Sequence, residues 1–201
     1  MTITYVYGKN LYVNPTNRCD CNCVFCLRHT GDGVGTGSNL WLEEEPTKEE
    51  MLEAIRASDL SQYQQLVFVG YGEPTYRLFD ILWVAEEVKK FSDIPIRMDT
   101  NGHSDLIWGR PTAQLFQGKF DILSVSLNNA TPETYLQTVR SRYGEKAYQA
   151  MLDFTREAVK YVPTVIMTVV DTLPPEEIEA CRKICEGLGA AYRVRKYSTE
   201  W

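Results

Sequence analysis

Short runs of β-branched and aromatic residues alternate along this chain with longer stretches whose apolar positions recur at helical spacing. The short runs predict strands at 65–71, 94–100, 121–127, 164–171 and 191–197. The longer stretches predict helices at about 76–91, 111–117, 134–161 with a break near Tyr143-Gly144, and 175–188. The segment Thr47-Lys48-Glu49-Glu50 has the capping-box pattern and predicts a further helix that ends near Ser58.

The N-terminal residues predict a β-hairpin, with arms at 3–7 and 11–14 joined through Gly8-Lys9-Asn10. If its second arm is counted as the first strand, six strands alternate with five helical segments. Strict alternation favours right-handed crossovers and a parallel sheet, either open or barrel-like. Because no linker or low-complexity tract interrupts the pattern, residues 1–201 are predicted to form a single domain.

Polar or glycine-rich residues follow four of the predicted strands. These segments are 19–26, 70–75, 99–102 and 126–129. In parallel α/β folds, ligands bind at the carboxyl ends of the strands, so the four segments are expected to converge on one site. A loop at 31–38 with four glycines follows the first of them, and it is a candidate wall for a substrate pocket.

Composition places the chain among ordinary globular proteins. It has 201 residues, a net charge of −6, 44% hydrophobic residues and 24% charged residues. The acidic balance argues against a dedicated nucleic-acid surface. No apolar run approaches the ~20 residues that a membrane-spanning helix requires. The first residues lack the pattern of a secretory signal, so a cytoplasmic location is expected.

Four of the six cysteines lie within eight residues, at 19, 21, 23 and 26. In a reducing compartment, clustered thiols indicate metal or redox chemistry rather than disulfides. The spacing C-x3-C-x2-C of Cys19, Cys23 and Cys26 lets three thiolates surround one face of an iron–sulfur cubane. Zinc accepts the same ligands, and His29 could complete a zinc tetrad. The cluster is favoured because zinc's usual paired C-x2-C knuckles are missing and a strand feeds the loop. Cys21 is interpreted as a bystander.

These residues carry a resemblance to a known family. Cys19, Cys23, Phe25 and Cys26 form the motif C-x3-C-x-aromatic-C after a first strand, which resembles the radical S-adenosylmethionine (SAM) enzymes. The resemblance implies a partial (β/α)6 TIM-like barrel with an N-terminal β-hairpin, and it implies a [4Fe–4S] cluster held by the three cysteines. It also implies reductive cleavage of SAM to a 5′-deoxyadenosyl radical, with an external flavodoxin- or ferredoxin-like electron donor.

Three further segments resemble signatures of the same family. Gly70-Tyr71-Gly72-Glu73-Pro74 resembles the GGEP motif, 99–102 resembles a D-T-N-G strand end, and 124–128 resembles a V-S-L-N strand. The resemblance implies that Glu73 and the neighbouring backbone hold the SAM amino group and that Phe25 lines the adenine site. The full set of implied cofactor contacts is Phe25, Gly70, Gly72, Glu73, Thr100, Asn101, Ser126 and Asn128.

Within that family, the short length, the hairpin, residues 12–19 and the glycine-rich loop resemble the TatD-associated radical SAM proteins. This resemblance implies a TatD-type metallohydrolase as a partner and implies no substrate. Two other subclasses stay open: an activase of a glycyl-radical enzyme, indicated by 99–102, and a 7-carboxy-7-deazaguanine synthase-like enzyme. A non-catalytic zinc or iron–sulfur module is the alternative from a different class.

The remaining candidates receive structural interpretations. Cys181 and Cys185 lie four apart on one predicted helix face and are expected in the core. His103 is interpreted as a loop histidine rather than a proton donor to the site. Arg193 and Arg195 are expected on a solvated edge rather than in the pocket. Tyr71 is the aromatic residue expected to face substrate.

Overall fold

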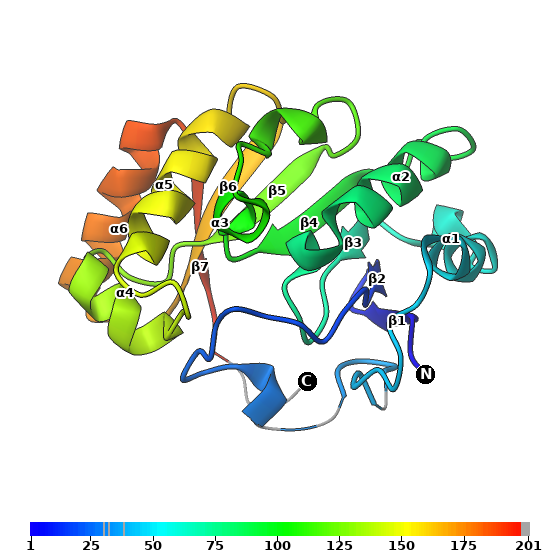
Figure 1. The fold of residues 1–201 in the computed structure, drawn as a ribbon, viewed down its shortest axis with the longest axis horizontal. Coiled ribbons are helices and arrows are strands. Elements are labelled where there is room, and N and C mark those ends of the chain that lie inside the picture. The colour runs from blue at the N-terminus through cyan, green and yellow to red at the C-terminus, as the bar shows by residue number, and fades with distance from the viewer. Residues whose placement is uncertain (30, 32, 38, 198–201) are drawn as a thin grey trace.

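One mostly parallel sheet organises the molecule (Figure 1). The computed structural model describes residues 1–29, 31, 33–37 and 39–197. Within these residues, seven strands follow one another in the order β1-β2-β3-β4-β5-β6-β7. They are β1 (Thr4–Tyr7), β2 (Asn10–Val13), β3 (Leu66–Phe68), β4 (Ile96–Thr100), β5 (Ile122–Ser126), β6 (Thr164–Val170) and β7 (Ala191–Arg195). The β1–β2 pair is antiparallel and every later neighbour is parallel.

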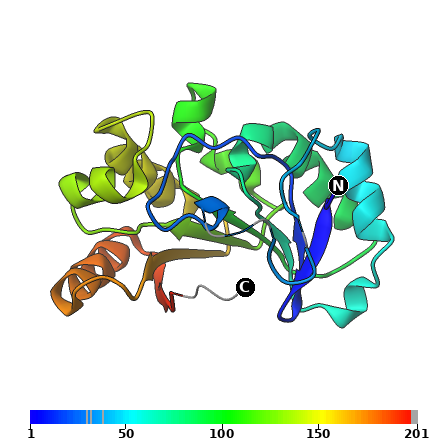
Figure 2. The same ribbon diagram turned by 90° about the horizontal axis from the view of Figure 1, so that it is seen from below.

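The helices cover the outer side of this sheet, while the cysteine segment crosses the opposite side (Figures 1 and 2). The α-helices are α1 (Lys48–Arg56), α2 (Leu78–Val88), α3 (Ser104–Trp108), α4 (Pro132–Val139), α5 (Lys146–Ala158) and α6 (Pro175–Leu188). Four short 3-10 turns are η1 (Leu27–His29), η2 (Leu60–Gln62), η3 (Pro74–Arg77) and η4 (Ala113–Phe116) within the described chain. No helix there is both long enough and apolar enough to cross a bilayer.

The predicted order of strands and helices agrees with this architecture, and both the N-terminal hairpin and the partial barrel are confirmed. The break expected near Tyr143-Gly144 separates α4 from α5, because Arg140 adopts a left-handed conformation (φ 50°) that ends α4. Two details differ. The helix predicted at 111–117 is only the 3-10 turn η4, and α3 was not predicted. A five-residue helix is too short to generate a periodic apolar pattern.

Two local features predicted from the sequence, the N-cap of α1 and the buried cysteine pair on α6, are present in the structure. Thr47 caps α1 reciprocally, since its side chain accepts from the Glu50 N–H and the Glu50 carboxylate accepts from the Thr47 N–H. Cys181 and Cys185 are fully buried in the main hydrophobic core, which confirms their structural interpretation.

The two faces of the strands differ sharply in polarity. On β4, Ile96, Met98 and Thr100 are buried, while Arg97 and Asp99 alternate with them and face a cavity on the inner side of the sheet. This cavity lies between the hairpin and β7, and the cysteine loop borders it.

Candidate functional site: the cysteine loop and its cavity

Backbone hydrogen bonds hold the cysteine loop, residues 14–29, across the carboxyl ends of the strands. The Glu73 N–H donates to the Arg18 carbonyl at 2.8 Å, which joins the loop to the segment after β3. Farther along, the N–H groups of Asn22 and Val24 donate to carbonyls near the end of α4 at 3.1 and 3.0 Å. The loop is therefore anchored at both sides of the mouth of the partial barrel.

The four thiols of the loop differ in burial. Cys19, Cys23 and Cys26 are partly buried, whereas Cys21 is only 5% exposed. Hydrogen bonds with the Cys19 and Cys23 thiols raise the pKa of the Cys21 thiol, and the contact with Cys21 lowers the pKa of the Cys23 thiol. Burial raises the pKa of Cys26.

The tightest cluster of possible ligand atoms within the described residues is not the predicted trio. Side-chain ligand atoms of Cys19, Asp20 and Cys21 lie within 4.8 Å of one another. His29 stands outside this group, and its Nε2 contacts the Asn22 side-chain oxygen at 3.1 Å. Asp20 and Cys21 are both engaged by other side chains, whereas the thiols of the predicted trio are the partly exposed ones of the loop.

A buried network that the sequence did not reveal engages Asp20. Its Oδ2 lies 2.6 Å from His103 Nδ1 and accepts from the Ser141 hydroxyl at 2.8 Å. Its Oδ1 accepts from Asn101 Nδ2 at 2.8 Å. Since a carboxylate only accepts, His103 Nδ1 carries the hydrogen, and His103 Nε2 lies 2.9 Å from the Tyr135 hydroxyl. We call Asp20, His103, Ser141 and Asn101 the Asp20 clamp.

The electrostatics of the clamp favour an ionised Asp20. Burial alone would raise the pKa of this carboxyl, but the hydrogen bond and charge of His103, together with Asn101 and Ser141, outweigh it and bring the pKa to about 2. The clamp thereby ties the cysteine loop to the end of β4 and to the α4–α5 connection, where Ser141 lies. His103 is fully buried, so it serves the loop rather than an open pocket.

Asp20→Asn is expected to lower the free energy of unfolding by about 3 kcal/mol, because an amide NH2 would face at least one of three buried donors. The matched control is Asp153→Asn, whose partner Arg156 lies with it on the exposed surface of α5; its effect should stay under about 0.5 kcal/mol. Urea unfolding of both variants tests this. A loss below about 1 kcal/mol for Asp20→Asn would show that the clamp is not a structural tie.

Gly70 and Gly72 allow the segment after β3 to touch the cysteine loop. A Cβ built on Gly70 would lie 1.9 Å from Asn14 Oδ1, and one on Gly72 would lie 2.4 Å from the Thr16 carbonyl oxygen. No side chain fits at either distance. The glycines of the predicted SAM motif are therefore required for this close approach.

Glu73 joins the ends of β3 and β4. Its Oε1 accepts from the Thr75 N–H and from the hydroxyls of Thr75 and Thr100, at 3.1, 2.7 and 2.7 Å, and its Oε2 accepts from the Asn101 N–H at 2.7 Å. Burial raises the pKa of the Glu73 carboxyl, and these hydrogen bonds act in the opposite direction. Most of the acceptor capacity of Glu73 is thus already used within the protein.

Asn128 lies in the fourth of the segments expected to converge, 126–129. It has a left-handed backbone (φ 62°) and is 5% exposed, and its Oδ1 is buried with no hydrogen-bond partner in the described part of the chain. Ser126, at the end of β5, is partly buried and pairs in register with Thr168. A buried acceptor in a strained backbone is the kind of group that a ligand satisfies.

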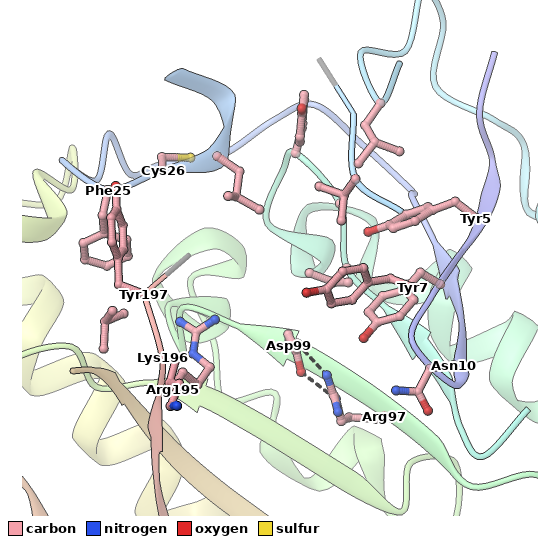
Figure 3. Close-up of a pocket in the computed structure, with 18 of the residues that line it drawn as sticks. Tyr5, Tyr7, Asn10, Phe25, Cys26, Arg97, Asp99, Arg195, Lys196 and Tyr197 are labelled. Carbon is pink, nitrogen blue, oxygen red and sulfur yellow. Dashed lines mark hydrogen bonds and ion pairs between the residues drawn. The ribbon is translucent and has the colours of Figure 1, made fainter. Parts of the chain in front are cut away.

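A cavity of about 560 Å³ opens beside the cysteine loop (Figure 3). Phe25, Cys26 and Gly70 line it, as do Tyr71 and Val34, the latter from the glycine-rich loop. The other predicted cofactor contacts, Gly72, Glu73, Thr100, Asn101, Ser126 and Asn128, are not among its lining residues. The structure thus brings part of the predicted set to the cavity. Glu73, Thr100 and Asn101 do not line it but are hydrogen-bonded to one another at the ends of β3 and β4.

Arg193 and Arg195 also line this cavity, so the prediction that β7 presents them on a solvated edge is wrong. The curvature of the sheet turns this face of the last strand toward the hairpin, and the Nε atoms of both arginines are buried. On β4, Arg97 pairs with Asp99 through two contacts, Nε to Oδ1 at 2.8 Å and Nη2 to Oδ2 at 2.9 Å.

Comparisons with known proteins agree with this geometry. The family model described as the radical SAM superfamily matches residues 13–184. A curated relative, the probable GTP 3′,8-cyclase of Methanothermobacter thermautotrophicus, is 27% identical over 188 residues. The match covers 92% of this chain but only 56% of the relative, so the chain spans about half the length of that protein.

Solved structures share the fold. SuiB from Streptococcus suis, in a crystal structure with bound S-adenosylmethionine, matches with a TM-score of 0.67 and 18% identity over 96% of this chain and 40% of its own. The FeFe-hydrogenase maturase HydG from Carboxydothermus hydrogenoformans matches with a TM-score of 0.65 and 16% identity, over 96% of this chain and 46% of HydG.

Proposed function

The chain belongs to the radical SAM superfamily, and from that premise we propose that it is a radical SAM enzyme with one [4Fe–4S] cluster and SAM as its cofactors. Cys19, Cys23 and Cys26 are the proposed ligands. Their thiols are the partly exposed ones of the loop, and soft thiolates suit an iron–sulfur cluster. Cys21 is not proposed as a cluster ligand, because its sulfur is buried and accepts a hydrogen bond from Asn101 Nδ2 at 3.3 Å.

SAM would lie between the cysteine loop and the strand ends. In this proposal Phe25 and Gly70 contact it from the cavity wall, Ser126 and Asn128 approach it from the end of β5, and the unpartnered Asn128 Oδ1 accepts one of its donors. Gly72 lets the segment after β3 approach the backbone of the cysteine loop. The hydrogen bonds of Glu73 with Thr100 and Asn101 hold that segment against the end of β4. The Glu73 Oε2, which accepts a single hydrogen bond from the protein, remains the candidate acceptor for the SAM ammonium group.

When bound, the cluster supplies the electron that cleaves SAM into methionine and a 5′-deoxyadenosyl radical. The protein must hold the two cofactors in contact and exclude water from the radical. The Asp20 clamp fixes the cysteine loop, and the small apolar cluster of Tyr5, Val34, Leu40 and Tyr71 closes one side of the cavity.

The finer assignments are also proposals. We place the chain among the TatD-associated radical SAM proteins, acting in the cytoplasm as a single domain (1–201), with a flavodoxin- or ferredoxin-like electron donor and a TatD-type metallohydrolase as partners. The hairpin and the glycine-rich loop support this placement, since the Thr36 N–H donates to the Val6 carbonyl and binds that loop to β1. The Arg97–Asp99 pair disfavours the activase subclass, because Asp99 already has a cation of the protein as its partner.

The observation that carries this proposal is the set of three partly exposed thiols on a loop clamped over the strand ends. Anaerobic reconstitution with iron and sulfide tests it. We expect a brown protein with the iron and sulfide content of one cubane cluster per chain, and an electron paramagnetic resonance signal of the reduced cluster that shifts when SAM is added. A colourless protein that binds one zinc ion would contradict the proposal and favour the metal-binding module.

A further inference from the structure

The inner side of the sheet is positively charged in a chain whose net charge is −6. Arg97, Arg193, Arg195 and Lys196 line the cavity beside Cys26. Asp99 is the single carboxylate among the lining residues that the structure describes. A local excess of guanidinium groups in a concave, partly buried site attracts anions even when the protein as a whole repels them.

These cations differ in how many hydrogen-bond and ion-pair partners they have. Arg97 is fully engaged, because it pairs with Asp99 and its Nη1 donates to Gln65 Oε1 at 3.0 Å. Arg193 has one long contact, from Nη2 to Ser124 Oγ at 3.4 Å. Neither Arg193 nor Arg195 has an ion-pair partner in the described part of the chain, and the Nε of each is buried without a hydrogen bond there.

An unpaired, partly buried cation costs free energy. The cost is visible at Arg195, where burial and the neighbouring charges of Arg193 and Arg97 lower the pKa, while Asp99 acts in the opposite direction. Both arginines project from alternate positions of β7, so their guanidinium groups share one face of the strand. Two adjacent guanidinium groups with free donors match the oxygen atoms of a carboxylate or phosphate.

Aromatic rings form another wall of the same cavity. Tyr5 and Tyr12 stack with their ring centroids 5.2 Å apart, and Tyr7 meets Tyr12 edge-on at 6.2 Å. Figure 3 shows Tyr5 and Tyr7 on the hairpin side and Arg195 and Lys196 on the β7 side. Such rings favour a planar, unsaturated group as their neighbour.

We propose that this cavity binds a substrate whose carboxylate or phosphate group contacts Arg193 and Arg195 and whose planar, unsaturated portion packs against the hairpin tyrosines. This inference rests on the proposed function, because the cavity adjoins the proposed cluster ligand Cys26. The carboxylate of SAM has the same chemistry, so the test must distinguish substrate from SAM.

Calorimetric titration of the reconstituted protein, saturated with SAM, tests the proposal with three probes: benzoate, phenyl phosphate and the uncharged match phenol. Both anions should bind at least about tenfold more tightly than phenol. Arg195→Gln should weaken anion binding at least about tenfold, Arg195→Lys should weaken it less, and the control Arg182→Gln, at an exposed site on α6, should leave it unchanged. Thermal melts establish that each variant is folded.

Two results would overturn the proposal. One is that the wild-type protein binds neither anion at millimolar concentration, or binds them as well after Arg195→Gln. The other is that Arg195→Gln weakens the binding of SAM itself by about tenfold or more, which would assign the guanidinium to the SAM carboxylate. Arg195-dependent anion binding by a wild-type protein that cleaves no SAM would support this inference while the proposed function fails.

Discussion

Cys23→Ala is expected to abolish both cluster assembly and SAM cleavage. Cys23 is the middle ligand of the proposed trio, and its loop is fixed on both sides by backbone hydrogen bonds. The Arg142 N–H donates to the Asp20 carbonyl, and the Val24 N–H donates to the Thr138 carbonyl. Residues behind metal ligands typically change affinity or activity by about 10- to 100-fold, so removal of a ligand should lower the yield of 5′-deoxyadenosine by more than about a hundredfold. Iron analysis after reconstitution and chromatography of the SAM products measure the two effects.

The other cysteines provide the controls. Cys181→Ala, in the hydrophobic core beneath α6, should leave iron content and SAM cleavage at wild-type levels. Cys21→Ser keeps a small polar side chain next to Asn101 and should lose far less iron than Cys23→Ala. If Cys21→Ser lost the cluster while Cys23→Ser retained it, the ligand assignment would be wrong.

Gly72→Ala should have the second largest effect. A Cβ at this position would lie 2.4 Å from the Thr16 carbonyl oxygen, 2.6 Å from the Arg18 carbonyl oxygen and 2.9 Å from the Arg18 nitrogen. All three are backbone atoms, so no side chain can rotate away and the cysteine loop itself must move. We expect a loss of about 2–3 kcal/mol in unfolding free energy, within the range for overpacking, and a fall in SAM affinity of at least about tenfold.

Gly187→Ala is the matched control for that substitution. Gly187 lies near the end of α6, and apart from its chain neighbours and the backbone of its own helix, no heavy atom lies within 4 Å of a Cβ built there. Alanine should therefore stabilise the helix by up to about 1 kcal/mol and leave SAM binding unchanged. Denaturant unfolding and SAM titration measure both variants. If Gly72→Ala kept its stability and its SAM affinity, the close approach would not be needed for the site.

The sequence predicted the strands and the cysteine trio because these signals are local. A β-branched run such as Thr164–Val170 specifies a strand by itself, and C-x3-C-x2-C is readable within eight residues. The Asp20 clamp has no such signal, since Asp20 and His103 are separated by 83 positions and meet only after β4 docks beside β3. Long-range polar pairs of this kind cannot be found from one sequence.

The orientation of β7 illustrates a different limit. Alternation in Ala191–Arg195 establishes that Arg193 and Arg195 share a face, but it does not specify which side of the sheet that face occupies. On an edge strand without a strong apolar face, polarity suggests solvent. The fold of the partial barrel decides otherwise, because the face of β7 that carries the two arginines lines the cavity.

Reductive cleavage of SAM tests the central claim most directly. The reconstituted wild-type protein, reduced with dithionite in the absence of oxygen and given SAM, should release 5′-deoxyadenosine and methionine, and the same reaction with Cys26→Ala should release neither above background. If the wild-type protein carries an intact [4Fe–4S] cluster and binds SAM yet yields no 5′-deoxyadenosine under reduction, the assignment of a radical SAM activity to this chain is contradicted.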